Sequence, residues 1–139
     1  MSDLIENALR WMSQAEYDLA ASEDILEDGR FNWACFVAQQ AAEKAVKSIY
    51  LSRGEDVDRV HSVSALVRGD ARRGISGLPE IEAELEAAAE LDRHYVPTRY
   101  PNGVPDGAPF EFYSKEKAEE CVEKAARIVA ACRKMLPAT

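Results

Sequence analysis

The chain has 139 residues, the size of one domain with enough apolar surface to fold without disulfides or a structural metal. Hydrophobic residues make up 47% and charged residues 30%, as in soluble globular proteins, and no stretch approaches the roughly 18 consecutive apolar residues of a membrane span. The net charge of −8 repels phosphate backbones at long range, which argues against a DNA-binding protein, although a local basic patch could still contact RNA.

The N-terminus and the cysteines indicate a cytoplasmic protein. The first residues are acidic and lack the basic and then apolar order of a secretory signal. Cys35, Cys121 and Cys132 form no C-x-x-C pair and fall within helical patterns, so we expect buried free thiols. We expect neither a metal nor a cofactor.

The first predicted helix runs from about Leu4 to Asp28 and ends at Gly29. Large apolar residues recur along it, and small residues fall between them on the same face. Such alternation allows a neighbouring helix to approach closely. The residues of this face are Ile5, Ala8, Met12, Ala15, Leu19, Ser22 and Leu26.

The second predicted helix runs from about Phe31 to Ser52, with Asn32 as its N-cap and Gly54 after its end. Its predicted inward face consists of Trp33, Phe36, Val37, Ala41, Ala45, Ser48 and Ile49. A polar stripe at helical spacing consists of Gln40, Glu43, Lys44 and Lys47. We interpret this stripe as a solvent-exposed face with helical ion pairs; a ligand site that uses Lys44 and Lys47 is the alternative.

Three further segments complete the helical pattern. A short helix is predicted over His61–Arg68, and a third long helix from Pro79 to about Tyr95. A proline- and glycine-rich loop follows over Val96–Tyr113, and Ser114 caps the last helix. We therefore predict one all-α domain over residues 1–139. Its architecture is an up-and-down four-helix bundle with an additional short helix and a long loop before the last helix.

The segment from Leu91 to Pro101 holds the candidate site residues. Arg93 and Arg99 are planar cations suited to phosphate, or they pair with nearby acidic residues. His94 is a candidate acid or base, or a half-exposed histidine that favours the helix C-terminus. Tyr95 and Tyr100 could stack on a nucleobase, or they could hold the loop on the bundle.

Three ordered segments make the chain resemble the HEPN domain family. The first helix contains a tryptophan and the run Ala15-Glu-Tyr-Asp-Leu-Ala. The second contains Gly29-Arg-Phe-Asn-Trp-Ala-Cys-Phe-Val-Ala-Gln-Gln-Ala-Ala-Glu-Lys-Ala-Val-Lys. The third is Thr98-Arg-Tyr-Pro101, followed by a proline-rich loop and an alanine-rich helix. The resemblance implies a homodimer that acts with a nucleotidyltransferase, frequently as a toxin–antitoxin pair. It also implies metal-independent endoribonuclease activity, which rests on an arginine, four to six intervening residues and a histidine.

This sequence departs from that catalytic pattern. No histidine follows Arg93 or Arg99 at the required spacing, and His94 directly adjoins Arg93. We therefore predict a binding or regulatory HEPN protein whose ligand, a nucleotide or RNA, contacts Arg99, Tyr100, Tyr95, Lys44 and Lys47. The alternative is an endoribonuclease that uses Arg93 and His94 in a non-standard arrangement. A free-standing nucleotide-binding protein is a third hypothesis.

Overall fold

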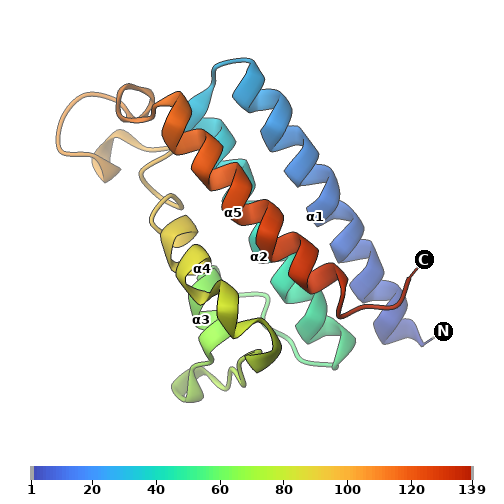
Figure 1. Ribbon diagram of the computed structural model, residues 1–139. Helices are drawn as coiled ribbons and strands as arrows, with labels where there is room; N and C mark the ends of the chain where they lie inside the picture. The colour runs from blue at the N-terminus through green and yellow to red at the C-terminus, as the bar shows by residue number, and fades with distance from the viewer. Residues whose placement is uncertain (1, 139) are drawn as a thin grey trace.

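The computed structural model describes residues 2–138, and this part of the chain is helical and contains no β-strand (Figure 1). The α-helices are α1 (Asp3–Glu27), α2 (Phe31–Ser52), α3 (Val63–Arg68), α4 (Leu85–Asp92) and α5 (Lys115–Arg133). Short 3-10 helices are η1 (Ala71–Arg73), η2 (Pro79–Glu84), η3 (Pro101–Gly103) and η4 (Pro109–Phe112). Figure 1 shows α1 antiparallel to α2, and α4 antiparallel to α5, as in an up-and-down bundle. The predicted all-α fold is confirmed.

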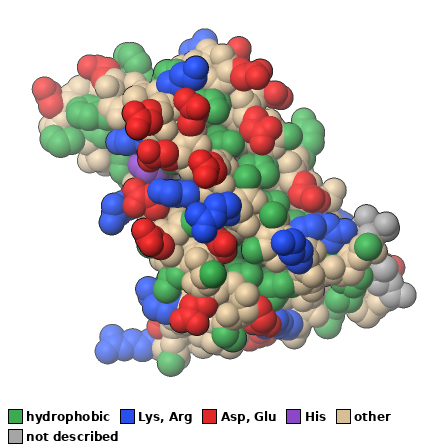
Figure 2. All heavy atoms as spheres, viewed as in Figure 1, with side chains coloured by type: hydrophobic (Ala, Val, Ile, Leu, Met, Phe, Trp, Pro, Cys, Tyr) green, Lys and Arg blue, Asp and Glu red, His purple; other side chains and the backbone are tan. Residues whose placement is uncertain are grey.

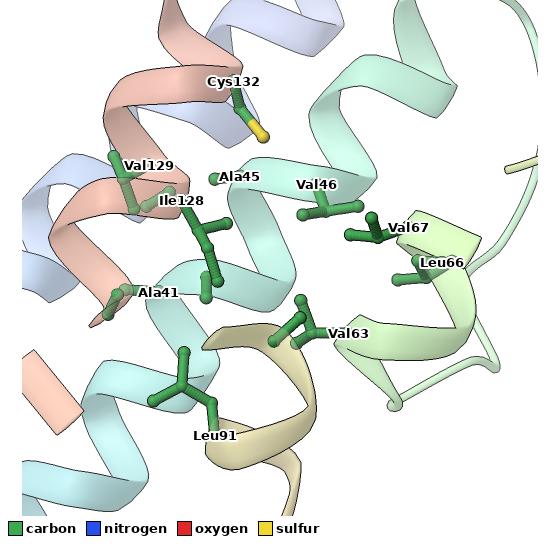
Figure 3. Packing of buried hydrophobic residues seen from close by; sticks show 14 of the residues in the cluster. Ala41, Ala45, Val46, Val63, Leu66, Val67, Leu91, Ile128, Val129 and Cys132 are labelled. Carbon is green, nitrogen blue, oxygen red and sulfur yellow. The ribbon is translucent and has the colours of Figure 1, made fainter. Parts of the chain in front are cut away.

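Helix α2 lies at the centre of the core and is buried on most sides. In Figure 3, Ala41 and Ala45 of α2 lie beside Ile128 of α5, while Val46 faces Val67 of α3. The alanines allow α5 to approach closely, and the branched side chains fill the space beside them. The apolar face predicted for the first helix packs within this chain, because its small residues and Met12 are buried.

The ends of the first two helices follow the sequence signals with one exception. Gly29 and Gly54 adopt φ values of 80° and 77°, a left-handed conformation that costs glycine little. Asn32 does not cap α2, because the helix already begins at Phe31 and the cap position is Arg30. The Asn32 side chain is instead available for a contact with a distant segment.

The predicted third long helix is wrong in its first half. Residues Pro79–Glu84 form the 3-10 helix η2, and α4 begins only at Leu85. Ile81 has φ −120° and ψ 24°, which breaks the helical path there. Leu78 and Ile81 are both buried around this break, so burial of these side chains accompanies the loss of regular helix.

Asp92, the last residue of α4, joins this helix to the start of α3. Its carboxylate accepts hydrogen bonds from the backbone N–H of Val63 at 2.8 Å and of Ser64 at 3.0 Å. The hydroxyls of Ser62 and Ser64 donate to it at 2.9 and 2.7 Å. A carboxylate at a helix N-terminus satisfies backbone donors that have no partner within the helix. The bonds fix the position from which the chain enters the candidate segment.

Candidate functional site

The segment after α4 folds back against the first turns of α2, and this brings two of the sequence motifs together. The Asn32 amide donates to the Thr98 carbonyl at 2.9 Å, across a sequence separation of 66 residues. Thr98 is fully buried, and its hydroxyl donates to the His94 carbonyl at 2.9 Å. These contacts hold the backbone on both sides of Arg99.

Arg99 packs against three aromatic rings. Its guanidinium carbon lies 4.4 Å from the ring centroid of Phe36, 4.7 Å from that of Tyr95 and 5.0 Å from that of Tyr100. Nε and Nη2 donate to the Tyr95 carbonyl at 3.0 and 2.8 Å. Each cation–π contact contributes about 0.5–2 kcal/mol. The two hydrogen bonds use only part of the guanidinium donor fork, so the oriented group retains N–H donors for a ligand.

Arg99 also lines a hollow of about 670 Å³ between the α1–α2 turn and η4. Other residues of its wall are Asp28, Arg30, Trp33, Pro109 and Phe110. Trp33 was predicted on the inward face of its helix, but it is 46% exposed at this hollow. Tyr100, Phe110 and Phe112 are exposed as well. In Figure 2, hydrophobic side chains lie among acidic ones over the end of the molecule that this loop forms. The arrangement offers two arginines and several aromatic faces to one ligand.

A polar cluster lies on the other side of Tyr95. The His61 ring stacks on the Tyr95 ring with a centroid distance of 5.4 Å and an interplanar angle of 14°. His61 Nδ1 lies 3.4 Å from Glu43 Oε2. Lys47 Nζ donates to the same oxygen at 3.0 Å and to the Asp58 carbonyl at 2.9 Å. Glu43 Oε1 is buried without a hydrogen-bond partner among the described residues.

The interpretation of the α2 polar stripe as a solvent-exposed face is therefore wrong for two of its residues. The side chains of Lys47 and Glu43 are only 4% and 7% exposed, because the segment that carries Asp58 and His61 covers them. Such a pair is stabilised only while both partners remain, since each charge is removed from water. The His61 side chain is 52% exposed and forms the solvent side of the cluster.

Lys44 lies apart from Arg99. Its ammonium forms an ion pair with Asp18 of α1. It lines a second hollow, of about 580 Å³, together with Arg10, Trp11 and Tyr17. The structure thus distributes the predicted ligand-binding residues over three places, and it brings only Arg99, Tyr95 and Tyr100 together.

Arg93 and His94 are adjacent in sequence but have different surroundings. The Arg93 side chain is 73% exposed and pairs with Glu90 at 3.1 Å. His94 is only 9% exposed, and its Nδ1 lies 2.9 Å from the Tyr113 hydroxyl. Burial raises the pKa of Tyr113, so its phenol stays protonated in this contact. The catalytic roles of Arg93 and His94 stay predictions.

Sequence reasoning did not assign Phe36, Glu43 or His61 to the site. Phe36 looks like an ordinary core residue of an amphipathic helix, and Glu43 like a surface residue. His61 lies outside the aromatic segment, and no local spacing connects it with Tyr95. Only the return of the chain along α2 joins these side chains.

No helix within residues 2–138 is both long and apolar enough for a membrane span. Comparison with known proteins gives a consistent family assignment. The HEPN domain model matches residues 8–135. MJ1304 of Methanocaldococcus jannaschii, which is named as a candidate toxin, is 29% identical over 137 residues, covering 90% of this chain and 85% of that protein.

Solved structures support the same family assignment. TT1696 from Thermus thermophilus superposes with a TM-score of 0.82 at 37% identity, covering 93% of this chain and 98% of that one. The archaeal HEPN homologue ST0689 has a TM-score of 0.73 at 33% identity, with 94% and 98% covered. A HEPN domain protein of Thermotoga maritima has a TM-score of 0.66 at 32% identity, with 91% and 96% covered. The chain belongs to the HEPN domain family.

Proposed function

We propose that this HEPN protein is a homodimeric binding and regulatory module that acts with a nucleotidyltransferase in a toxin–antitoxin-like pair. The name of the relative MJ1304 as a candidate toxin supports the toxin–antitoxin context. A cytoplasmic location fits the three free, buried cysteines. Exposed aromatic rings around the Arg99 hollow offer apolar surface for a subunit or a ligand.

The ligand is a nucleotide or single-stranded RNA, and it binds at Arg99. The observation that carries this proposal is the fixed guanidinium of Arg99, which is held by aromatic rings and the Tyr95 carbonyl at the wall of an open hollow. An oriented guanidinium suits a phosphate, and exposed rings such as Trp33 and Tyr100 stack on bases without regard to their identity.

Fluorescence anisotropy with labelled single-stranded RNA and a panel of nucleotides tests the binding site. We expect Arg99→Gln to weaken binding at least about tenfold, which corresponds to about 1.4 kcal/mol. Arg68→Gln is the matched control, because Arg68 is an exposed arginine at the C-terminal end of α3, outside the hollow. Equal affinities for the wild type and the Arg99 variant would reject the site.

The assembly is tested separately. Size-exclusion chromatography with light scattering should give the mass of a dimer at micromolar protein concentration. Co-expression with any nucleotidyltransferase encoded beside the gene should give a complex that remains intact through two chromatography steps. A strict monomer that copurifies with no such partner would contradict this part of the proposal.

A second candidate function is metal-independent cleavage of RNA, and the His61–Glu43 contact favours it. A carboxylate at Nδ1 holds a histidine in the tautomer whose Nε2 accepts a proton, and the His61 side chain is 52% exposed. His61 and Arg99 both pack on Tyr95, so a base and a phosphate-binding group lie near one another.

Incubation with structured and unstructured RNA in EDTA tests this second function. If the activity exists, cleavage should leave 2′,3′-cyclic phosphate ends, and His61→Ala should abolish it. Retained cleavage in His61→Ala together with loss in His94→Ala would instead return the base to His94. Binding without any cleavage would leave the regulatory function alone.

A further inference from the structure

Two of the three cysteines lie next to one another in the core between α2 and α5. Cys35 Sγ lies 3.9 Å from the carbonyl oxygen of Lys117. Lys117 stands one turn before Cys121 on α5, and helical side chains lean over the turn that precedes them. The Cys121 thiol therefore extends toward Cys35, and each thiol shifts the pKa of the other. Cys132 lies elsewhere on α5, three turns further along.

The surroundings of Cys121 favour its thiolate. The neighbouring Cys35 thiol is the main cause and His94 adds to it, so that the pKa of Cys121 is lowered against the effect of burial. The Nδ1 atom of His94 lies 2.9 Å from the Tyr113 hydroxyl, and His94 and Cys121 line the same small hollow. The neighbouring Cys121 and burial raise the pKa of Cys35, so this thiol keeps its proton.

A small hollow leads to Cys121. It measures about 40 Å³, and its lining includes Glu90, His94, Lys117 and Cys121. The space suits a molecule about as large as water, whose share of liquid volume is about 30 Å³. A small peroxide can therefore reach a sulfur that larger reagents cannot.

We propose that Cys121 and Cys35 are a redox-active dithiol that a small hydroperoxide oxidises to an intramolecular disulfide between α5 and α2. The Cys121 thiolate attacks one peroxide oxygen, the O–O bond breaks, and the departing hydroxide takes a proton from solvent to form water. Cys121 is now a sulfenic acid. The Cys35 sulfur attacks the Cys121 sulfur, the S–O bond breaks, and the oxygen leaves as a second water with the Cys35 proton. The sulfur pair loses two electrons to the peroxide.

Oxidation of Cys121 favours the subsequent attack by Cys35. The raised pKa of Cys35 results from the neighbouring Cys121 and from burial. Oxidation removes the thiolate charge of Cys121, so the contribution of Cys121 to the raised pKa falls when Cys35 must act as the nucleophile, while the contribution of burial remains. Cys132 has no such partner within the described residues, and burial raises its pKa to about 12.

Oxidation of the full-length wild-type protein with equimolar hydrogen peroxide tests the proposal. We expect two of the three thiols to disappear together and to return with dithiothreitol. Mass spectrometry of a non-reduced digest should show a peptide that joins Cys35 to Cys121 and a Cys132 that remains alkylatable. The pair should react at least about tenfold faster than Cys132.

Two variants provide controls. Cys132→Ser should retain the loss of two thiols, whereas Cys35→Ser should give no intramolecular disulfide and should leave a Cys121 sulfenic acid that dimedone traps once the protein is denatured. The proposal is overturned if Cys132 oxidises as fast as the pair, or if the disulfide joins two chains. Glutathione added to the wild-type sample shows whether the peroxide is active. If the glutathione is oxidised while Cys35 and Cys121 stay unreacted, the proposal is overturned as well, and this result does not depend on the folding of any variant.

Discussion

The buried ion pair of α2 gives the sharpest stability prediction. In Lys47→Met the aliphatic part of the side chain is largely conserved, but the ammonium that binds Glu43 and the Asp58 carbonyl is removed. The Glu43 carboxylate then remains in a site where it is only 7% exposed and where one of its oxygens already has no hydrogen-bond partner. Its remaining polar partner among the described residues is His61, at 3.4 Å. Loss of one partner of a buried pair costs about 3–5 kcal/mol. A solvent-exposed pair contributes only about 0.2–1 kcal/mol.

Urea unfolding followed by circular dichroism measures this difference. We expect Lys47→Met to lose about 3 kcal/mol or more, and Glu43→Gln/Lys47→Met to recover a large part of that loss because no charge remains buried. Lys44→Met is the matched control on the same helix. Its partly exposed pair with Asp18 should contribute about 1 kcal/mol or less. A loss below about 1 kcal/mol in Lys47→Met would show that the cluster is hydrated, and it would refute the reasoning.

Three further predictions concern other contacts. Asp92→Ala removes the acceptor of two backbone N–H groups at the start of α3 and should cost about 2–3 kcal/mol in urea unfolding; a cost under about 0.5 kcal/mol would contradict the capping role. Asn32→Ala leaves the buried Thr98 carbonyl without its donor, so we expect a loss of about 1–2 kcal/mol and faster amide hydrogen exchange over residues 96–104, with unchanged exchange in α5. Burial raises the pKa of Cys132 from 9.0 to about 12, so above pH 9 the unfolded chain releases a proton that the folded chain keeps, and stability falls as pH rises. Cys132→Ala should make this fall between pH 9 and pH 11 less steep, and an unchanged slope would assign the fall to other groups.

The sequence was sufficient for the parts of the fold that local periodicity determines. The long helices α1, α2 and α5 have apolar faces that repeat over many turns, and glycines stand where two of them end. The start of α4 could not be predicted in the same way, because residues 79–84 have helical composition. Their break at Ile81 accompanies the burial of this side chain in the core, which is a tertiary and not a local property.

The exposure of a polar helix face is likewise not a local property. Glu43 and Lys47 have the spacing of an ordinary surface pair, and that spacing is the same whether water or protein covers it. The cover comes from Asp58 and His61, which belong to an irregular segment without a periodic signal. A solvent-exposed face was therefore the natural reading of the sequence.

The candidate site likewise contains residues that a local sequence pattern identifies and residues that only the fold brings to it. Arg99 and the two tyrosines could be selected from the sequence because cations and aromatic residues are concentrated in a short segment before the proline-rich loop. Phe36 could not, since its role depends on the contact between the start of α2 and a segment more than sixty residues away. The family resemblance rests partly on both segments, but it does not show that they contact one another.

The two histidines illustrate why the choice of a catalytic candidate requires the fold. His94 attracts attention in the sequence because it adjoins Arg93, yet the structure buries its ring against Tyr113, beside a thiol. His61 attracts little attention, yet it is half exposed, has a carboxylate at one nitrogen, and shares the Tyr95 ring with Arg99. A base must reach both its substrate and solvent, whereas a buried imidazole can still orient a neighbouring sulfur. The structure thus favours His61 for acid–base chemistry on a bound ligand and His94 for control of Cys121, and separate assays of cleavage and of thiol oxidation distinguish the two roles.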